Sequence, residues 1–240
     1  MSKPFPPVRL SIIVPLGPNE PRWPALLDQF SMLPKGSEII LTGFSHSQRP
    51  TELDNPPEPL RSLKWIWCVS DKGRALQLNT GAAQASGDYL WFIHADSVLT
   101  QDNIQSLLTS IQQNQERLYY FDLWFYDKET RWLSINEWGA KFRSNKLGAP
   151  YGDQGLSISR SQFFELGGYP TDADYGEDHL FVWKARQRGI QLQPCHTKLA
   201  TSARKYHDYG WLKLTLRYQY LWLLQATPEF IKLLKTKTFQ

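Results

Sequence analysis

Short apolar runs alternate with helix-like patterns through the first half of the chain. The runs are rich in β-branched and aromatic residues and end at turn-forming residues, which is typical of buried strands. We expect strands over Leu10–Val14, Glu38–Thr42, Leu63–Val69 and Tyr89–Ile93. Apolar residues at helical spacing predict helices over Pro24–Met32, Gly73–Ala85 and Asp102–Ile111. This alternation predicts an α/β fold with a mostly parallel central sheet flanked by helices on both faces.

Beyond Leu118 the alternation becomes irregular. A long apolar run over Leu118–Tyr126 predicts a strand that would be antiparallel to the others. Further strands are expected over Leu156–Ser159 and Ile190–Gln193, and helices over Trp132–Phe142, Asp178–Arg188, Trp211–Ala226 and Glu229–Leu234. Pro228 separates the last two helices because proline has no N–H and disrupts a helix interior. We expect a single domain over residues 1–240, with a core at about 9–205 and a C-terminal helical appendage at about 206–240.

Composition excludes several classes of protein. Charged residues make up 21% and apolar residues 41%, which argues against a disordered chain. The net charge is +4, without the clusters of lysine and arginine typical of nucleic-acid binding, so no nucleic-acid partner is expected. The N-terminus has no apolar stretch of the kind found in a secretory signal. Two cysteines build no disulfide framework and fit a reducing cytosol, so we expect a cytoplasmic protein.

Candidate ligand-binding residues follow the expected strands, where parallel sheets bind ligands. Asp96 follows the fourth strand, where a carboxylate could hold a divalent cation that bridges phosphates, or could cap the next helix. The segment Asp71–Arg74 opens a helix. An anion would be favoured there by the free N–H groups of the helix start and by the cations Lys72 and Arg74. Gly73 would allow the anion to approach the backbone closely. A solvated, charged turn is the alternative explanation.

A further pair of acids begins a later helix. Glu177 and Asp178 complement the dipole of that helix, which on this feature alone is the favoured explanation. The functional alternative is a general base that takes a proton from an attacking hydroxyl group. The sequence has no zinc-site spacing, no dinucleotide or P-loop glycine motif, and no G-x-S-x-G, which argues against those sites.

Taken in order, several segments resemble the family-2 glycosyltransferases. They are SIIVP at Ser11–Pro15 with Asn19 and Glu20, then KGRALQLNTGAAQASGDYLWFIHAD at Lys72–Asp96, then Gly155–Asp178. The resemblance covers about residues 10–205. It is closest to a small bacterial branch of soluble transferases with the motifs GRA-x-Q-x-N-x-G at Gly73–Gly81, HAD at His94–Asp96 and GDQG at Gly152–Gly155. It implies a GT-A fold and inverting transfer of a sugar from a nucleotide-sugar donor to a hydroxyl acceptor.

The resemblance also implies roles for individual residues. Pro15, Asn19 and Glu20 would cradle the nucleoside, and Lys72 and Arg74, next to Gly73, would face the nucleotide. Asp96 would bind the divalent metal, Mn²⁺ or Mg²⁺, although His94 replaces the first acid of the family's D-x-D motif. Asp178 would be the catalytic base, with Glu177 as a possible donor or acceptor contact.

Two other segments allow more than one explanation. Asp153 and Gln154 could contact the donor sugar or the acceptor, or simply form a tight turn. Ser202 and Arg204 could reach the pyrophosphate, or be solvated at the surface. The sequence therefore leaves both pairs open between a ligand-binding and a structural role.

The C-terminal helix allows a membrane contact. Lys213 and Arg217 share one face of Trp211–Ala226, among aromatic residues. Such a helix could bind peripherally at the inner face of a membrane, although packing against its own domain is favoured.

Two alternative functions remain. One is a nucleotide- or membrane-binding relic without turnover, which His94 and the replacement of an acidic pair by Gly43-Phe44-Ser45 favour. The other is a nucleotidyltransferase, which would need a cationic loop directly after the first strand. Residues 17–20 contain no cation, which ranks this alternative lower.

Overall fold

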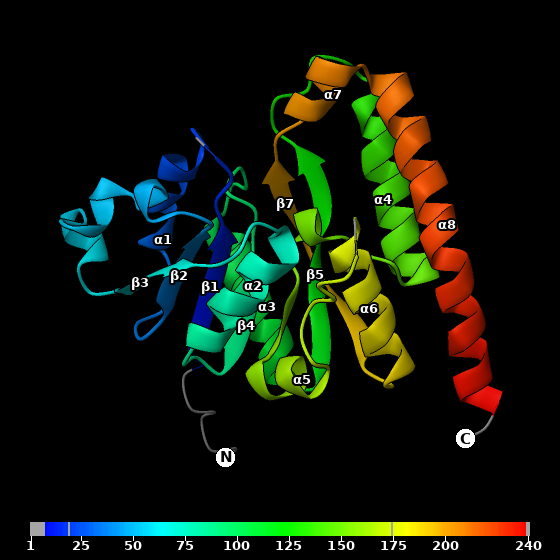
Figure 1. Cartoon of the computed structure of the whole chain (residues 1–240), viewed down its shortest axis with the longest axis horizontal. Coiled ribbons are helices and arrows are strands. Elements are labelled where there is room, and N and C mark those ends of the chain that lie inside the picture. Colours follow the sequence, from blue (N-terminus) through cyan, green and yellow to red (C-terminus); the bar gives the residue numbers. More distant parts are fainter. Residues whose placement is uncertain (1–7, 19, 174, 239–240) are drawn as a thin grey trace.

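The computed structural model describes residues 8–18, 20–173 and 175–238 (Figure 1). Within these residues, seven strands form one sheet in the order β3-β2-β1-β4-β6-β5-β7. The strands are β1 (Leu10–Pro15), β2 (Glu38–Gly43), β3 (Lys64–Val69), β4 (Tyr89–Phe92), β5 (Arg117–Phe125), β6 (Ser157–Ser159) and β7 (Gln191–Thr201). The α-helices are α1 (Leu27–Phe30), α2 (Arg74–Gln84), α3 (Gln101–Gln113), α4 (Leu133–Leu147), α5 (Arg160–Glu165), α6 (Glu177–Gln187), α7 (Arg204–Tyr209) and α8 (Trp211–Thr238). Short 3₁₀ turns lie at Trp23–Leu26, His46–Gln48, Thr51–Leu53, Glu58–Leu60 and Gly152–Gln154.

The predicted mostly parallel sheet is confirmed. The strands β1 to β4 pair in parallel, and β5 pairs in parallel with β7. The short strand β6 lies between β4 and β5 and is antiparallel to both. The expectation that the run at Leu118–Tyr126 is the antiparallel strand is therefore wrong. The antiparallel strand is instead β6, which has only three residues. The alternation becomes irregular in this half of the sequence because the connections between strands are long.

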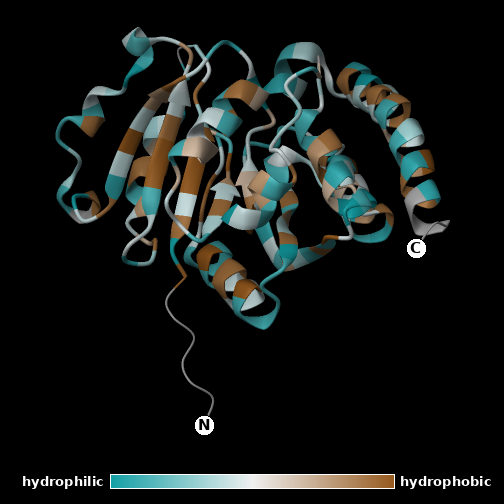
Figure 2. Cartoon of the chain, turned by 60° about the horizontal axis from the view of Figure 1, so that its bottom comes forward, coloured by the Kyte–Doolittle hydropathy of each residue, from teal (hydrophilic) through white to brown (hydrophobic). Residues whose placement is uncertain are grey.

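Helices cover both faces of the sheet, and two apolar cores result. Alternate residues of β1 point to opposite faces, so Ile12 joins the core beneath α1 and α3 while Ile13 joins the core beneath α2, α5 and α6. Apolar residues accordingly concentrate along the strands in Figure 2. Burial on both faces explains why these strands appear in the sequence as nearly continuous apolar runs.

The C-terminal helix differs from the sequence-based expectation. Helix α8 runs through Pro228 without a break, so the prediction of two helices separated there is wrong. Ala226 and Leu233, on either side of the proline, pack with Trp183 of α6. Gln187 of α6 also donates to the backbone oxygen of Glu229 at 3.1 Å. These contacts on both sides hold the helix together where proline removes a backbone hydrogen bond.

The last strand is also longer than predicted. The sequence predicts a strand over Ile190–Gln193, whereas β7 extends from Gln191 to Thr201 along the whole of β5. The pairing register shifts between Tyr120 and Asp122, and His196 has a positive φ of 59°. This irregularity interrupts the alternation that marks a strand in the sequence. The extension carries Thr201 to the carboxyl edge of the sheet.

Candidate active site

Polar residues from both halves of the sheet meet at its carboxyl edge. Glu20 follows β1, Asp96 follows β4 and Asp127 follows β5, while Ser202 and Arg204 follow β7. Because β6 is reversed, the segment before it, which contains Asp153, lies at the same edge. The first residues of α2 and α6 complete the group with Arg74, Glu177 and Asp178.

An ion-pair cluster joins the starts of α2 and α6. Arg74 Nη2 lies 3.1 Å from Asp178 Oδ2, and its Nε lies 2.6 Å from Glu177 Oε1. The backbone N–H groups of Gly152 and His179 donate to the Asp178 carboxylate at 2.6 and 2.8 Å. Burial alone would raise the pKa of Asp178, but Arg74 and the two N–H donors lower it below the usual range. Asp178 is therefore ionised at neutral pH.

Two glycines allow this cluster to form. A Cβ atom on Gly152 would lie 2.7 Å from Arg74 Nη2 and 2.8 Å from Asp178 Oδ2, so any side chain there would displace the ion pair. Gly176 precedes α6 with φ of 66°, and a Cβ there would lie 2.3 Å from Gln225 of α8. Glycine tolerates both the close approach and the left-handed backbone. The sequence around α6 is thus shaped to bring its first acids against Arg74.

The neighbouring titratable groups have shifted pKa values. Burial raises the pKa of Asp153 to about 6. The negative charges of Asp178 and Asp96 also raise this pKa, whereas the positive charges of Arg143 and Arg74 lower it. Asp153 Oδ1 is buried and has no hydrogen-bond partner among the described residues. Burial, together with the charge of Arg74, lowers the pKa of His94 to about 3, so this imidazole is neutral. The cluster thus combines ionised and neutral groups at neutral pH, which is typical of functional sites.

Asp96 lies in an electrostatically unfavourable position beside a second acid. Its Oδ1 accepts a hydrogen bond from the Thr201 hydroxyl at 3.2 Å. Burial and then the negative charge of Glu20 raise the pKa of Asp96, so a bound cation would relieve an unfavourable charge. No group of three or more His, Cys, Asp or Glu side chains within the described ranges could hold a metal.

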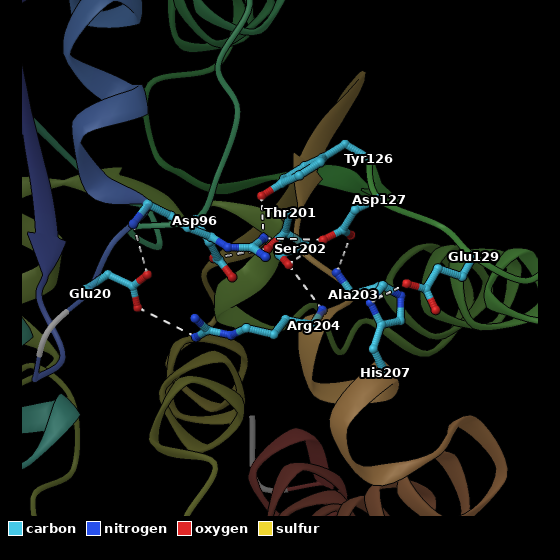
Figure 3. Close-up of polar contacts among 11 residues, drawn as sticks. Glu20, Asp96, Tyr126, Asp127, Glu129, Thr201, Ser202, Ala203, Arg204 and His207 are labelled. Atoms are coloured by element: carbon cyan, nitrogen blue, oxygen red, sulfur yellow. Dashed lines mark hydrogen bonds and ion pairs between the residues drawn. The ribbon is translucent and has the colours of Figure 1, made fainter.

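A second network ties three loops together (Figure 3). The Asp127 carboxylate accepts hydrogen bonds from the Ser202 hydroxyl at 2.7 Å and the Ala203 N–H at 2.6 Å. It also accepts one from Arg22 Nη1 at 3.2 Å, and Arg204 Nη2 lies 3.7 Å from Glu20 Oε2. Arg22 and Glu20 follow β1, whereas the other residues follow β5 and β7. The network therefore fixes the relative positions of the loops that frame the site.

The structure brings together many of the predicted site residues. One cluster contains Arg74, Asp153, Glu177 and Asp178. The charge of Asp96 raises the pKa of Asp153 in this cluster. Glu20 and Arg204 form an ion pair nearby. Pro15 is the last residue of β1, and Gly73 directly precedes α2. Asn19 lies outside the described residues.

Two predicted residues stand apart from this cluster. The side chain of Lys72 is exposed. Gln154 is fully buried, and its amide donates to Phe121 O at 2.8 Å and accepts from the Ser144 hydroxyl at 2.8 Å and Tyr151 N at 3.1 Å. The structure thus gives Gln154 the role of holding the loop before β6.

Sequence reasoning missed several residues of the site. The positive charge of Lys205 lowers the pKa values of Asp96, His94 and Glu177. Lys205 follows Arg204 directly in the sequence, and two adjacent cations are a signal from which it could have been predicted. The Arg143 guanidinium lies 3.5 Å from the centre of the Tyr151 ring and acts on Asp153. Arg143 lies in the middle of α4, where an arginine carries no functional signal in the sequence.

The sheet topology, with acids and cations from both halves at its carboxyl edge, defines a fold of the GT-A type. The family model for glycosyl transferase family 2 matches residues 54–164. The chain is therefore similar to this family over that segment, which runs from the loop after β2 to α5. A comparison with curated protein sequences found no match.

Solved structures share the fold. A mannosyltransferase from Pyrobaculum calidifontis, PcManGT, solved with GDP-Man and Mn²⁺, superposes with a TM-score of 0.67 at 18% identity, covering 86% of this chain and 61% of that one. TarS from S. aureus superposes with a TM-score of 0.63 at 14% identity, covering 81% of this chain and 37% of that one. A shorter form of TarS, residues 1–349, has been solved with UDP-GlcNAc. The chain thus spans between 37% and 61% of the length of these proteins.

Proposed function

We propose that the protein transfers a sugar from a nucleotide-sugar donor to a hydroxyl acceptor, with inversion at the anomeric carbon and with a divalent cation, Mn²⁺ or Mg²⁺. The observation that carries the proposal is the ion-pair cluster of Arg74 with Glu177 and Asp178, beside Asp153 and Asp96. The match of residues 54–164 to the family model supports sugar transfer, and the structure of PcManGT with GDP-Man and Mn²⁺ supports the choice of ligands.

The donor diphosphate would bind where cations and free N–H groups converge. Arg74 begins α2, whose first N–H groups favour an anion, and Lys72 lies just before it. Lys205 adds a third positive charge near Asp96. Pro15, Glu20 and Gly73 line the loops beside this position, where we place the nucleoside. This arrangement would stabilise the negative charge that develops on a leaving nucleoside diphosphate.

Asp96 would hold the divalent cation together with the donor phosphates. The cation would supply positive charge to the departing diphosphate. Glu20 adds negative charge near Asp96, which favours the bound cation further.

Asp178 is the proposed general base. In an inverting transfer the acceptor oxygen attacks the anomeric carbon while the bond to the diphosphate breaks, and the hydroxyl proton passes to a carboxylate. Asp178 is ionised at neutral pH and is therefore able to accept this proton. A donor diphosphate that draws Arg74 away would raise the pKa of Asp178, so donor binding would make the carboxylate a stronger base. Glu177 and Asp153 lie beside it as candidate acceptor contacts.

Screening donors by thermal unfolding would test the proposal. Sugar conjugates of UDP, GDP, ADP, CMP and dTDP are added with and without Mn²⁺ or Mg²⁺. A donor at about 100 times its Kd stabilises by about 2.7 kcal/mol, or roughly 5–11 °C for a chain of this size. Release of the nucleoside diphosphate from the best donor then measures turnover, and NMR of the product assigns the anomer.

Three outcomes separate the alternatives. A donor that binds but never turns over with any acceptor would indicate a relic. Release of pyrophosphate from a nucleoside triphosphate and a sugar phosphate would indicate a nucleotidyltransferase. Retention at the anomeric carbon would overturn the inverting mechanism.

The expected location is the cytoplasm. Cys68 and Cys195 are both buried and free, which fits a reducing compartment. Within the described ranges, no helix has the length and apolarity needed to cross a membrane.

A further inference from the structure

Helix α8 has two apolar faces. One face packs on the protein through Leu214, Ala226 and Leu233, which are buried. The other face is open to solvent and carries apolar side chains that recur at helical spacing, and we call it the outer stripe. Its members, with their exposed fractions, are Leu212 (58%), Leu216 (61%), Tyr220 (62%), Leu223 (53%) and Phe230 (49%).

The outer stripe is unusual for a surface. Isolated exposed apolar residues are common and need no explanation, whereas a continuous exposed row marks an interaction site. Apolar residues recur along α8 in Figure 2, at the edge of the molecule that ends in the C-terminus. The neighbouring α4 also exposes Trp138 and Phe142, whose rings stack with centres 5.8 Å apart. The outer edge of the molecule, formed by α4 and α8, therefore exposes apolar side chains in addition to those that pack against the rest of the protein.

Unpaired cations flank the outer stripe. Lys213, Arg217 and Lys235 lie on one side of it, and in the part of the chain that the structure describes none of them forms an ion pair. Glu229, the one acid in the sequence of α8, is 2.6 Å from Lys232 and also accepts a hydrogen bond from Gln187 at 2.8 Å. The surface thus presents apolar and positive groups together. Its complement is an apolar layer with a negative rim.

We propose that the outer stripe of α8 docks on the surface of an anionic lipid bilayer. The leucines and aromatic rings would enter the boundary between headgroups and acyl chains, while Lys213 and Arg217 would face the lipid phosphates. The helix would lie on the membrane, because no helix in the described ranges could cross one. A second copy of the chain fits less well, since a symmetric contact through the stripe would bring the same unpaired cations together.

Docking would also orient the candidate active site. Gln225 on the inner face of α8 lies 3.3 Å from Nδ1 of His179 and donates to the Tyr175 carbonyl at 2.6 Å. These residues flank Glu177 and Asp178 at the start of α6. The membrane-facing helix therefore directly supports the segment that carries the proposed base. The docking itself does not depend on sugar transfer.

Vesicle sedimentation of the protein with residues 1–240 tests the proposal without an activity assay. The vesicles contain phosphatidylcholine alone or an equimolar mixture with phosphatidylglycerol. A stripe variant carries Leu216→Gln and Leu223→Gln, and its control is Phe164→Gln, which removes a residue 44% exposed on α5. A charge variant carries Lys213→Gln and Arg217→Gln, and its control removes two exposed cations elsewhere through Lys35→Gln and Arg188→Gln. Thermal unfolding verifies that every variant is folded.

The expected results are specific to the lipid and to the position. The unaltered protein should bind the mixed vesicles and bind phosphatidylcholine much more weakly. The stripe variant should lose at least about tenfold in partitioning. The charge variant should lose about 25-fold, at roughly fivefold for each of its two cations near an anionic surface. Both controls should bind like the unaltered protein.

Several results would overturn the proposal. One is an unaltered protein that stays in the supernatant with mixed vesicles. Another is a charge variant that loses no more binding than its control. A dimer in solution that the stripe variant converts to a monomer would instead assign the stripe to a second copy of the chain.

Discussion

Arg74 Nη2 and Asp178 Oδ2 lie 3.1 Å apart although 104 positions separate the two residues in the sequence. The contact joins the start of α2, in the half of the fold built on β1 to β4, to the start of α6, which lies between β6 and β7. Neither helix start has a side-chain cap. The ion pair therefore places a positive charge at one helix start against negative charges at another, and it fixes the two halves of the candidate site relative to each other.

Replacing Arg74 should cost stability. Arg74→Gln leaves Glu177 and Asp178 side by side without their counterion. Since the Arg74 side chain is 37% exposed and partly screened by water, we expect a loss of about 1–2 kcal/mol at pH 7, below that of a fully buried pair. The loss should be smaller at about pH 3, because a lowered carboxyl pKa stabilises the fold fully above its ordinary value of 3.8, and this stabilisation is lost as pH falls through the folded-state pKa. Chemical denaturation at both pH values measures it.

The adjacent cation serves as the control for this experiment. Lys72→Gln removes an exposed charge two residues earlier and should change stability by less than about 0.5 kcal/mol. Equal stability of the two variants would mean that Arg74 does not support the fold.

Asp178→Asn should strongly reduce turnover and preserve donor binding. An amide accepts no proton at neutral pH, so we expect kcat to fall by about 10²–10⁴ while the Kd of the donor changes little. Glu177→Gln is the matched control, since it also removes one carboxylate partner of Arg74 and should reduce kcat far less. Normal turnover by Asp178→Asn, with the matched donor and acceptor, would refute its role as the base.

Asp153 should make stability depend on pH in the opposite direction from Asp178. Its folded-state pKa of about 6 exceeds the ordinary value of 3.8, so the folded form binds the proton more tightly than the unfolded form. The stabilisation is complete below about pH 4 and is lost as pH rises through 6. Asp153→Asn should therefore stabilise the protein by about 1–3 kcal/mol at pH 8 and leave it nearly unchanged at pH 4.

Thermal unfolding across that pH range is the measurement for Asp153. Its control is Asp172→Asn, an exposed acid in the segment before α6, which should show no such pH-dependent gain. A variant of Asp153 that is destabilised at pH 8 would show that its charged form is well solvated.

Asp96→Asn should remove the metal-dependent part of the nucleotide response. If Asp96 holds a cation together with the donor phosphates, the extra thermal shift that Mn²⁺ adds to a nucleotide should disappear. The metal-independent shift, which reflects Arg74 and the start of α2, should remain. Asp102→Asn, an exposed acid after the same strand, is the control. An unchanged metal effect in Asp96→Asn would show that the cation binds elsewhere.

The arrangement of the sheet could largely be predicted from the sequence. Strands such as β1 and β2 are buried on both faces, so their apolar runs are unmistakable. The continuity of α8 through Pro228 could not, because contacts of Trp183 and Gln187 on α6 outweigh the local preference of proline. Likewise, β7 contains a bulge that hides its length.

The candidate site could be predicted only in part. Reasoning from helix starts singled out Arg74 and Asp178, but treated each as a group that faces a ligand or solvent. Their mutual contact depends on a fold that brings distant helices together, and no local pattern encodes it. The positions of Asp127 and Arg143 could not be predicted for the same reason. They depend on where β5 ends and on how α4 packs.

The reversed strand β6 has a consequence for how such a site can diversify. In a parallel sheet every loop at the binding edge follows a strand and must connect that strand to the next helix. Here one segment at that edge, residues 148–156, precedes its strand and connects α4 to β6. Insertions between Gly148 and Tyr151 could therefore reshape one side of the candidate site while the pairing of β1 to β4 and the start of α2 stay unchanged. On the proposed function, acceptor preference could change in evolution through this one connection, while the proposed donor-binding residues at the start of α2 stay the same.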